Sequence, residues 1–381
     1  MKLQQQLWTA TAGWSGPQTP ATSAATQLVL CFGSPDTLRQ AALFAQLREW
    51  YPNAVITGCS TAGEILGTRV HDDSLVVTGV AFEHSTVDWI NVPAAEGGDG
   101  REAAERIADK LVRPGLRHVL VLCDGLAVNG SELARALRER LPAGVCATGG
   151  LAADGDRFVE TLVACNGPGQ ARQVVAIGFY GDRLHIGYGS LGGWDSFGPA
   201  RRITRSQGNV LFELDGRPAL ELYKAYLGEH AAGLPATGLR FPLLLEDGQD
   251  GQDGRGLVRT VLGVDEAAGS MTFGGDMPEG ALARLMKANF DRLVDGASGA
   301  AAAAHRSVGG QEAELALLVS CVGRKLVLRQ RVEEELDSVR EVLGSAALTG
   351  FYSYGELCPQ GTQGGCELHN QTMTITTFSE A

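Results

Sequence analysis

Three stretches of the chain repeat the same order of hydrophobic and polar positions. Each stretch opens with a short apolar run that ends in Cys-x-Gly, at Leu28–Gly33, Leu120–Gly125 and Leu318–Gly323. An uninterrupted apolar run of this length is typical of a strand buried on both faces. An amphipathic segment follows each run and predicts a helix, at Asp36–Trp50, Ser131–Arg140 and Arg329–Val342. The three stretches therefore predict one repeated unit that begins with a strand and a helix.

Two more strands complete each unit. The second strand runs into a glycine turn, at Val55–Gly58, Val145–Gly149 and Leu348–Gly350. The third strand is expected at Leu75–Phe82, Phe158–Cys165 and Thr372–Phe378. The crossover helix makes the first two strands parallel, and the trailing strand makes the sheet mixed. The pattern predicts an α/β fold with mixed sheets built from repeated β-α-β-β units. It also places the glycine turns at the carboxyl ends of strands, where open α/β sheets usually bind ligands.

The pattern changes between the second and third units. Gln173–Tyr188 alternates apolar and polar residues, which predicts two antiparallel strands around a Gly-Asp turn. Gly280–Leu293 is predicted to be a helix, and Gly296–Ala304 fits either a flexible linker or a close-packed helix. Asp247–Gly254 has no apolar residue to bury and is predicted to be a mobile loop.

Composition and charge exclude several classes of partner. The net charge of −12 argues against nucleic acid and anionic membranes, because both require a basic surface. No apolar stretch is long enough to span a bilayer, and no charged-then-apolar leader opens the chain, so we expect a cytoplasmic protein. In that compartment the eight cysteines are expected to be thiols. A chain of 381 residues usually forms two domains.

Five motifs, spread in order over nearly the whole chain, carry a family resemblance. They are Gly58–Ile65, Thr148–Asp154, Leu214–Ala219, Tyr354–Leu357 and Leu368–Met373. Together they resemble FIST proteins, which are bacterial sensory modules with an amino-terminal and a carboxyl-terminal FIST domain in tandem. The resemblance implies one domain over residues 1–215 and a second over residues 216–381. It also implies a sensor rather than an enzyme.

The resemblance carries expectations about ligands and partners. FIST domains are proposed to bind small ligands, amino acids among them, and to pass the signal to an output domain. No kinase, cyclase or other effector segment is evident in this sequence, so we expect it to signal through a separate protein. FIST proteins of this layout resemble the NosP group, haem proteins that sense nitric oxide and control a histidine kinase. The resemblance therefore implies b-type haem, nitric oxide as the signal and a histidine kinase as the partner.

Haem requires an axial ligand, and His369 is the first candidate. It lies between a polar loop and a strand, and Asn370 would support its imidazole by hydrogen bonding. Alternatively, both side chains cap backbone groups where the strand begins. His185, on a predicted strand, and Cys358, in a Cys-Pro pair, are the other candidate iron ligands. The alternatives, which the sequence favours, are a half-buried core histidine at His185 and a simple loop cysteine at Cys358.

Two glutamates occupy equivalent places in the first and third units. Glu64 and Glu356 each follow a glycine turn, and as a facing pair they would serve as acid and base or hold an amino group. Alternatively, each accepts backbone N–H groups of its own turn. With Asn370 they would bind a small polar metabolite, which is the alternative to a haem sensor.

The remaining candidates are aromatic and sulfur side chains. Tyr352 and Tyr354 alternate along a strand, so at most one of them faces a pocket. A haem would need an apolar cleft, and its expected lining is Phe351, Tyr352, Leu357 and Trp194. Cys59 or Ser60 with His369 would make a nucleophile and base, although the sequence has no Gly-x-Ser-x-Gly elbow.

Overall fold

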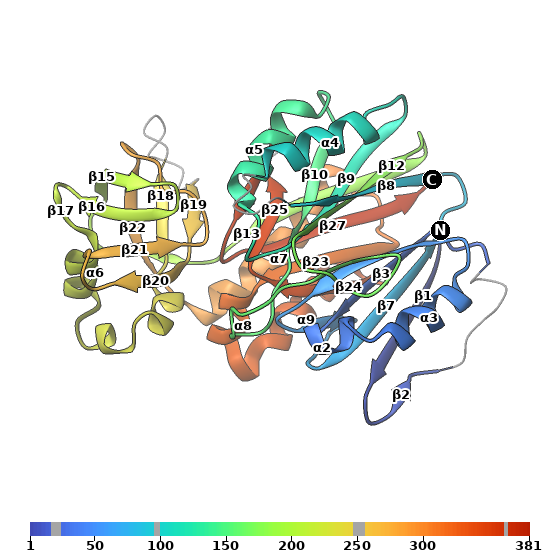
Figure 1. The fold of residues 1–381 in the computed structure, drawn as a ribbon, viewed down its shortest axis with the longest axis horizontal. Coiled ribbons are helices and arrows are strands. Elements are labelled where there is room, and N and C mark those ends of the chain that lie inside the picture. Colours follow the sequence, from blue (N-terminus) through green and yellow to red (C-terminus); the bar gives the residue numbers. More distant parts are fainter. Residues whose placement is uncertain (17–23, 95–99, 247–255, 362–364) are drawn as a thin grey trace.

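The computed structural model divides into a large body and a smaller lobe (Figure 1). It describes residues 1–16, 24–94, 100–246, 256–361 and 365–381. The lobe comprises the described part of residues 195–287. It is inserted ahead of the third repeated unit, between β13 (Leu184–Leu191) and α7 (Phe290–Ser307). The rest of the chain forms the body.

Each repeated unit forms the centre of one mixed sheet of the body, with its first strand between its second and third strands. The first unit contributes β4 (Val55–Ser60), β3 (Leu28–Gly33) and β7 (Ser74–Ala81). The second contributes β10 (Cys146–Leu151), β9 (Leu116–Cys123) and β12 (Gln173–Tyr180). The third contributes β24 (Ala347–Ser353), β23 (Leu315–Cys321) and β27 (Met373–Glu380). First and second strands are parallel and the third is antiparallel, which confirms the predicted mixed α/β fold.

Helices connect the first and second strands of each unit. The crossovers are α3 (Ala41–Trp50), α5 (Gly130–Arg140) and α9 (Val332–Leu343), preceded in two units by the short helices α2 (Pro35–Leu38) and α8 (Val322–Leu328). Each crossover helix buries one face, as in α5, where Leu133, Ala134 and Leu137 have no exposed surface. The three crossover helices lie where the polar and apolar positions placed them, with the first divided into α2 and α3.

The third strand of the second unit was predicted in the wrong place. It is β12, and not Phe158–Cys165. The Asp154 carboxylate accepts hydrogen bonds from the backbone N–H groups of residues 158, 159 and 160, each at 2.9 Å. These bonds hold the start of the predicted strand as a loop. Only β11 (Val163–Cys165) is extended, and it joins the sheet of the first unit.

Two further predictions need correction. The strands expected within Gln173–Tyr188 exist, but β12 and β13 do not pair with each other, because the turn between them leads from one sheet into another. The helix expected at Gly280–Leu293 begins only at Phe290. The residues before Phe290 include the strand β22 (Leu282–Lys287), which pairs with β18 (Leu243–Glu246). Buried and partly exposed residues alternate along most of β22, as is typical of a strand. Gly296–Ala304 belongs to the close-packed helix α7. The loop predicted at Asp247–Gly254 lies outside the described residues.

Each unit donates a short strand to the sheet of another unit. The first unit donates β5 (Glu64–Leu66) to β24 of the third. The third donates β25 (Gly355–Pro359) to β10 of the second, and the second donates β11 to β4 of the first. Two donated strands continue as hairpins, with β6 (Arg69–His71) and β26 (Cys366–His369). The exchange is cyclic, so every body sheet contains strands from two units.

The ends of the three second strands meet in the body, where backbone hydrogen bonds join them in a ring. The donors and acceptors are Ala153 N–H to Ser60 O (2.8 Å), Tyr354 N–H to Leu151 O (3.2 Å) and Ala62 N–H to Tyr352 O (2.8 Å). All six residues are buried. The ends of the second strands are therefore occupied by buried protein groups, although the sequence analysis expected a ligand to bind there.

Outer strands and the chain ends complete the body. β1 (Lys2–Thr9) extends the first sheet and pairs also with β2 (Gly13–Trp14), β8 (Thr86–Pro93) extends the second, and β13 extends the third. α4 (Arg101–Leu111) packs beside α5. The amino-terminal ammonium lies 2.7 Å from Glu314 Oε1 and 3.6 Å from Glu380 Oε2, which brings the two ends of the chain together (Figure 1).

The lobe is an antiparallel sheet covered by one α-helix among its described residues. Its strands are β14 (Asp195–Ser196), β15 (Arg201–Gln207), β16 (Val210–Leu214), β17 (Arg217–Pro218), β18, β19 (Gly256–Arg259), β20 (Val261–Asp265), β21 (Ser270–Phe273) and β22. α6 (Ala219–Leu227) packs on the sheet through Leu220, Tyr223 and Leu227.

The domain boundary predicted after residue 215 falls inside this lobe, between β16 and β17, and stays a prediction. None of the described helices combines the length and apolar character that crossing a membrane requires.

Glycine is required where the first and second strands of a unit approach each other. A Cβ on Gly58 would lie 1.6 Å from Cys31 O, and the equivalent distances are 1.9 Å at Gly149 and at Gly350. We expect Gly58→Ala to lower the free energy of unfolding by about 3 kcal/mol or more, because two strands would have to separate. Gly167→Ala, where nothing lies within 4 Å, should change it by less than about 1 kcal/mol. Chemical denaturation measures both, and equal effects would contradict the close approach.

Candidate functional site

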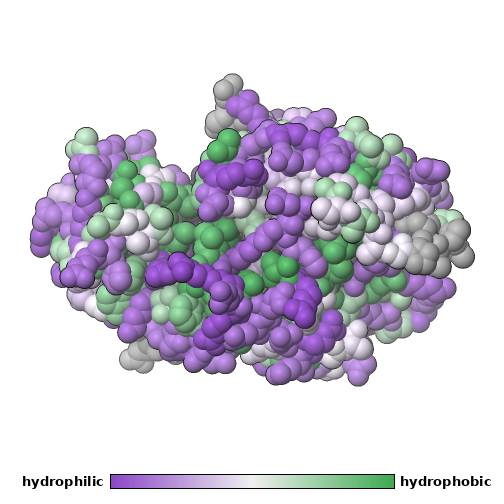
Figure 2. Space-filling model, turned by 90° about the horizontal axis from the view of Figure 1, so that it is seen from below, coloured by the Kyte–Doolittle hydropathy of each residue, from purple (hydrophilic) through white to green (hydrophobic). Residues whose placement is uncertain are grey.

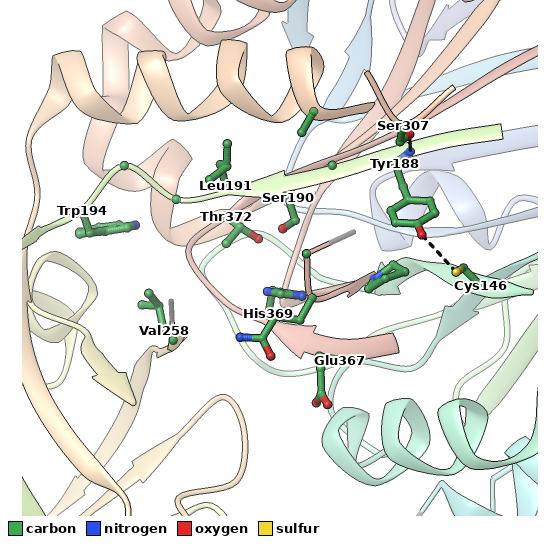
Figure 3. A pocket seen from close by; sticks show the side chains of 18 of the residues that line it. Cys146, Tyr188, Ser190, Leu191, Trp194, Val258, Ser307, Glu367, His369 and Thr372 are labelled. Atoms are coloured by element: carbon green, nitrogen blue, oxygen red, sulfur yellow. Dashed lines mark hydrogen bonds between the residues drawn. The ribbon is translucent and has the colours of Figure 1, made fainter. Parts of the chain in front are cut away.

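A cleft of 1810 Å³ lies between the lobe and the body. Its walls come from β13 and the residues after it, from β26, from the end of α7 and from β18, β19 and β22 of the lobe. Seen from below, hydrophobic residues are exposed along the junction of lobe and body (Figure 2). Trp194 and Val258 lie at one end of the cleft, His369 and Thr372 near its middle, and Tyr188 and Cys146 at the other end (Figure 3).

The chain enters and leaves the lobe beside this cleft. Gly193 has a φ of +94° and a Cβ there would lie 1.9 Å from Arg292 O, so the entering and returning segments touch. The Arg324 guanidinium donates to Gly192 O on the entering segment and to Leu293 O, at 2.7 Å, on the returning one. Its charge is balanced by Glu335, at 2.8 Å, and both side chains have no exposed surface. One buried cation therefore joins both connections of the lobe to the body.

His369 lies on the cleft wall at the end of β26. Its Nε2 is 3.0 Å from the carbonyl oxygen of Cys358. Burial lowers the pKa of His369 to about 4, so the imidazole is neutral at physiological pH. With Nε2–H donating to that carbonyl, Nδ1 carries the free lone pair. A neutral imidazole on a cleft wall is suited to bind a metal through its free nitrogen.

Asn370 follows directly and is buried at the junction with the lobe. Its Nδ2 donates to His369 O at 3.1 Å, so it does not hold the imidazole as predicted. Its Oδ1 has no hydrogen-bond partner among the described residues. Gly274 of the lobe lies against that amide, where a Cβ would be 3.0 Å from Oδ1. Asn370 therefore contributes an unused acceptor to the contact between lobe and body.

The residues around His369 attach the lobe. We call Leu368–Thr372 the seam segment. Arg259 of the lobe donates to Leu368 O at 2.9 Å, and Gln371 donates to Leu239 O of the lobe at 3.2 Å. Trp194, where the chain enters the lobe, donates its indole N–H to Gln371 O at 2.8 Å. One short segment thus forms part of the cleft wall and bonds both the lobe and its connection.

Glu356 and Glu64 are buried and fully engaged inside the body. Glu356 accepts from the Ser353 hydroxyl at 2.7 Å and from the N–H and hydroxyl of Thr372 at 3.2 and 2.9 Å. Glu64 accepts the equivalent bonds, from Thr61 Oγ1 (2.5 Å), Ser74 N (3.3 Å) and Ser74 Oγ (2.7 Å). Burial raises the pKa of Glu356 to about 8 and that of Glu64 to about 7. Neither carboxyl lines the cleft, and each joins its turn to the start of a third strand.

The structure adds a counterpart to His369 that the sequence analysis missed. Glu356 pairs with His369 across β25 and β26, and Glu64 pairs with His71 across β5 and β6. The residue before the Ser or Thr that bonds each glutamate has a positive φ, +53° at Asp73 and +62° at Gln371. The shared order Gly-Glu, then His-x-x-Ser/Thr, was the available signal. The loop between the glutamate and the histidine differs in length between the two units, which made this shared order hard to detect in the sequence.

The two tyrosines point into the body. Tyr352 donates to Glu335 at 2.7 Å, and Tyr354 donates to Asp154. Neither lines the cleft. Of the residues expected to line a haem cleft, Trp194 does so, whereas Phe351, Tyr352 and Leu357 have no exposed surface. Alternation along a strand does not separate these tyrosines, because residues two apart share one face; Tyr354 lies just beyond β24, which ends at Ser353.

Three other candidates, Cys59, Cys358 and His185, lie outside the cleft lining. Cys59 and Cys358 are fully buried, and burial raises the pKa of both thiols well above the usual range. The Ser60 hydroxyl accepts the N–H of Leu162 at 2.8 Å. His185 is half-buried on β13. In the described parts of the chain, no group of three or more His, Cys, Asp or Glu side chains is arranged to hold a metal ion.

Sequence comparison relates the chain to known domains. The FIST N domain matches residues 27–217 and the FIST C domain matches residues 219–359. The uncharacterized protein Rv0628c of Mycobacterium tuberculosis is 25% identical over 365 residues, covering 92% of this chain and 91% of that protein. Mb0898c of Mycobacterium bovis, also uncharacterized, is 26% identical over 186 residues, 46% of each chain. A cyanuric acid hydrolase structure from A. caulinodans gives a TM-score of only 0.20 at 13% identity, covering 78% of this chain and 99% of that one. FIST domains suggest a sensory role in signal transduction.

The buried carboxyl of Glu356 predicts a pH dependence of stability. Its folded-state pKa is raised to about 8 from 4.5, so between these values the folded protein holds a proton that the unfolded chain releases. Stability should therefore fall as pH rises through this window. Glu356→Gln keeps the acceptor without the charge, and thermal unfolding between pH 5 and pH 8.5 should show a smaller loss than in the wild type. Identical pH profiles would contradict the raised pKa.

Proposed function

The chain belongs to the FIST family, and we propose that it is a sensory protein whose ligand binds in the cleft between lobe and body. The protein signals to a separate partner, and a histidine kinase is the partner that its resemblance to the NosP group suggests. The signal arises because the ligand has different affinities for different arrangements of lobe and body, as any ligand-driven change requires.

The seam segment carries this proposal. His369 and Thr372 line the cleft, and the same segment bonds the lobe through Leu368 O and Gln371. A ligand on this wall contacts the backbone that attaches the lobe. Its binding energy therefore acts directly on the contact between lobe and body, without a long intervening path.

Binding without catalysis is the simpler use of this site. The nucleophile candidates Cys59 and Ser60 are buried, and the hydroxyl of Ser60 is engaged by Leu162. Neither lines the cleft that contains His369. We therefore assign the protein no reaction.

Haem is a second candidate ligand, favoured by the neutral imidazole on the cleft wall. The residues fit such a group: His369 would bind the iron, Trp194 and Val258 offer apolar contacts, and lining cations such as Arg306 suit the propionates. Bound haem would supply an iron that takes a diatomic gas such as nitric oxide. Cys358 does not fit as the ligand, because its thiol is fully buried and held protonated.

The haem candidate predicts a coloured protein. Protein purified from haem-supplemented cells should show a Soret band that shifts with reduction and with nitric oxide. His369→Ala should abolish haem retention, and His185→Ala, a half-buried histidine outside the cleft, should leave it unchanged. Normal loading of His369→Ala would exclude this ligand assignment. Failure of the wild type to bind added hemin would exclude haem and leave the metabolite sensor.

The metabolite sensor predicts a ligand that raises the melting temperature. Two exposed leucines provide a matched pair of variants: Leu191 lines the cleft and is 45% exposed, and Leu262 lies on β20 and is 41% exposed. A metabolite found by thermal-shift screening should bind Leu191→Asp at least about tenfold more weakly, because an apolar contact is replaced by a charge. Its affinity for Leu262→Asp should not change. Equal affinity for both variants would place the ligand elsewhere.

A further inference from the structure

Positive side chains line the cleft in excess, although the chain as a whole is acidic. The lining contains five cations, Arg117, Arg138, Lys287, Arg292 and Arg306, and two carboxylates, Asp195 and Glu367. The chain has a net charge of −12. A concave site with a surplus of one sign of charge concentrates ions of the other sign. The lining therefore favours anions over the cations that the rest of the surface attracts.

Most of these cations already have a carboxylate partner. Arg138 pairs with Glu367 and Arg292 pairs with Asp195, which uses both carboxylates of the lining. Lys287 lies opposite Asp195 across β14 and β22, so its charge is partly balanced. These three cations therefore offer little positive charge to a ligand.

Arg306 is different, because no ion pair joins it to any described residue. It lies in the last turn of α7, and Ala303, Arg306 and Ser307 all line the cleft. Residues three and four apart share one face of a helix, so this face points to the cleft. Arg117, the remaining lining cation, pairs only with Asp182, whose side chain is 92% exposed. Such an exposed pair contributes little, so its charge also remains available.

Tyr188 lines the same cleft as Arg306 and lies close to Ser307, the residue that follows Arg306 (Figure 3). The backbone N–H of Tyr188 donates to Ser307 Oγ at 3.1 Å, which ties β13 to the last turn of α7. The Tyr188 hydroxyl is 3.3 Å from Cys146 Sγ, so hydrogen bonds hold both the backbone and the hydroxyl of this residue and orient its ring (Figure 3). A fixed aromatic ring and an unpaired guanidinium in the lining of one cleft suit a flat organic molecule that carries a negative group.

We propose that this end of the cleft binds a planar organic anion, with its carboxylate, sulfonate or phosphate on Arg306 and its apolar face against Tyr188. The inference rests on the proposed function, since it takes the cleft as the ligand site. Haem, with two carboxylates, and a planar acid metabolite both belong to this class. The absorption experiment above separates these two sources.

Two dyes with the same rings test the charge alone. The anionic probe is 8-anilinonaphthalene-1-sulfonate, and N-phenyl-1-naphthylamine lacks only the sulfonate. On the full chain, the sulfonate dye should bind more tightly than the neutral dye, and its affinity should fall as salt is added. Arg306→Gln should weaken the sulfonate dye about tenfold and leave the neutral dye unchanged, because a charge-assisted contact is lost. Arg306→Lys should retain most of the affinity.

A matched control and a second variant keep the outcomes distinct. Arg106→Gln removes an exposed cation of α4 that lies outside the cleft lining and should affect neither dye. Leu191→Asp should weaken both dyes if they occupy the cleft. Equal binding of the two dyes, with Arg306→Gln unchanged and Leu191→Asp weakened, would overturn the anion inference and leave the cleft as a ligand site. Dye binding that Leu191→Asp does not weaken, or no binding at all, would overturn the inference and count against the cleft itself.

Discussion

The cyclic exchange of short strands is the constraint on which the body depends. Each second strand needs a neighbour that another unit supplies, and a ring of three backbone hydrogen bonds closes where the second strands end. Buried backbone groups without partners are costly, so no unit can complete its sheet alone. The carboxyls of Glu64 and Glu356 belong to this closure, because each joins a donated strand to the start of a third strand. Their burial in the closed centre is what raises their pKa.

This closure determines where a ligand can bind. Open α/β sheets leave the carboxyl ends of their strands accessible, but here the ends of the second strands contact one another. The cleft instead lies where the repeat is interrupted, beside the lobe inserted between β13 and α7. Insertion brings side chains of separate elements, such as Trp194, Val258 and His369, to one surface (Figure 3). The insertion thereby creates a site from elements of both lobe and body.

Local patterns predicted much of the fold and little of the site. Apolar runs and helical periodicity located the first two strands and the crossover helix of every unit, since these features depend on neighbouring residues. The donated strands could not be predicted, because β5 is three residues long and its partner in β24 lies about 280 residues away. His369 was identified from its motif. The cleft was not, because its walls come from elements whose proximity only the tertiary fold creates.

The way the lobe is attached limits how a signal can leave the cleft. Arg324 bonds both connections of the lobe and is itself paired with Glu335 in the interior. Moving the connections away would leave two N–H donors of this buried cation without acceptors, at about 1–3 kcal/mol each, which is as much as most ligands supply as a difference between two states. Movement at the connections is therefore disfavoured. The seam segment contains no charged residue, bonds the lobe through Leu368 O and Gln371, and holds the unused Oδ1 of Asn370 against it. A shift of the lobe against the seam segment that keeps the connections intact separates no ion pair of that segment, and it is the rearrangement that this bonding pattern leaves open.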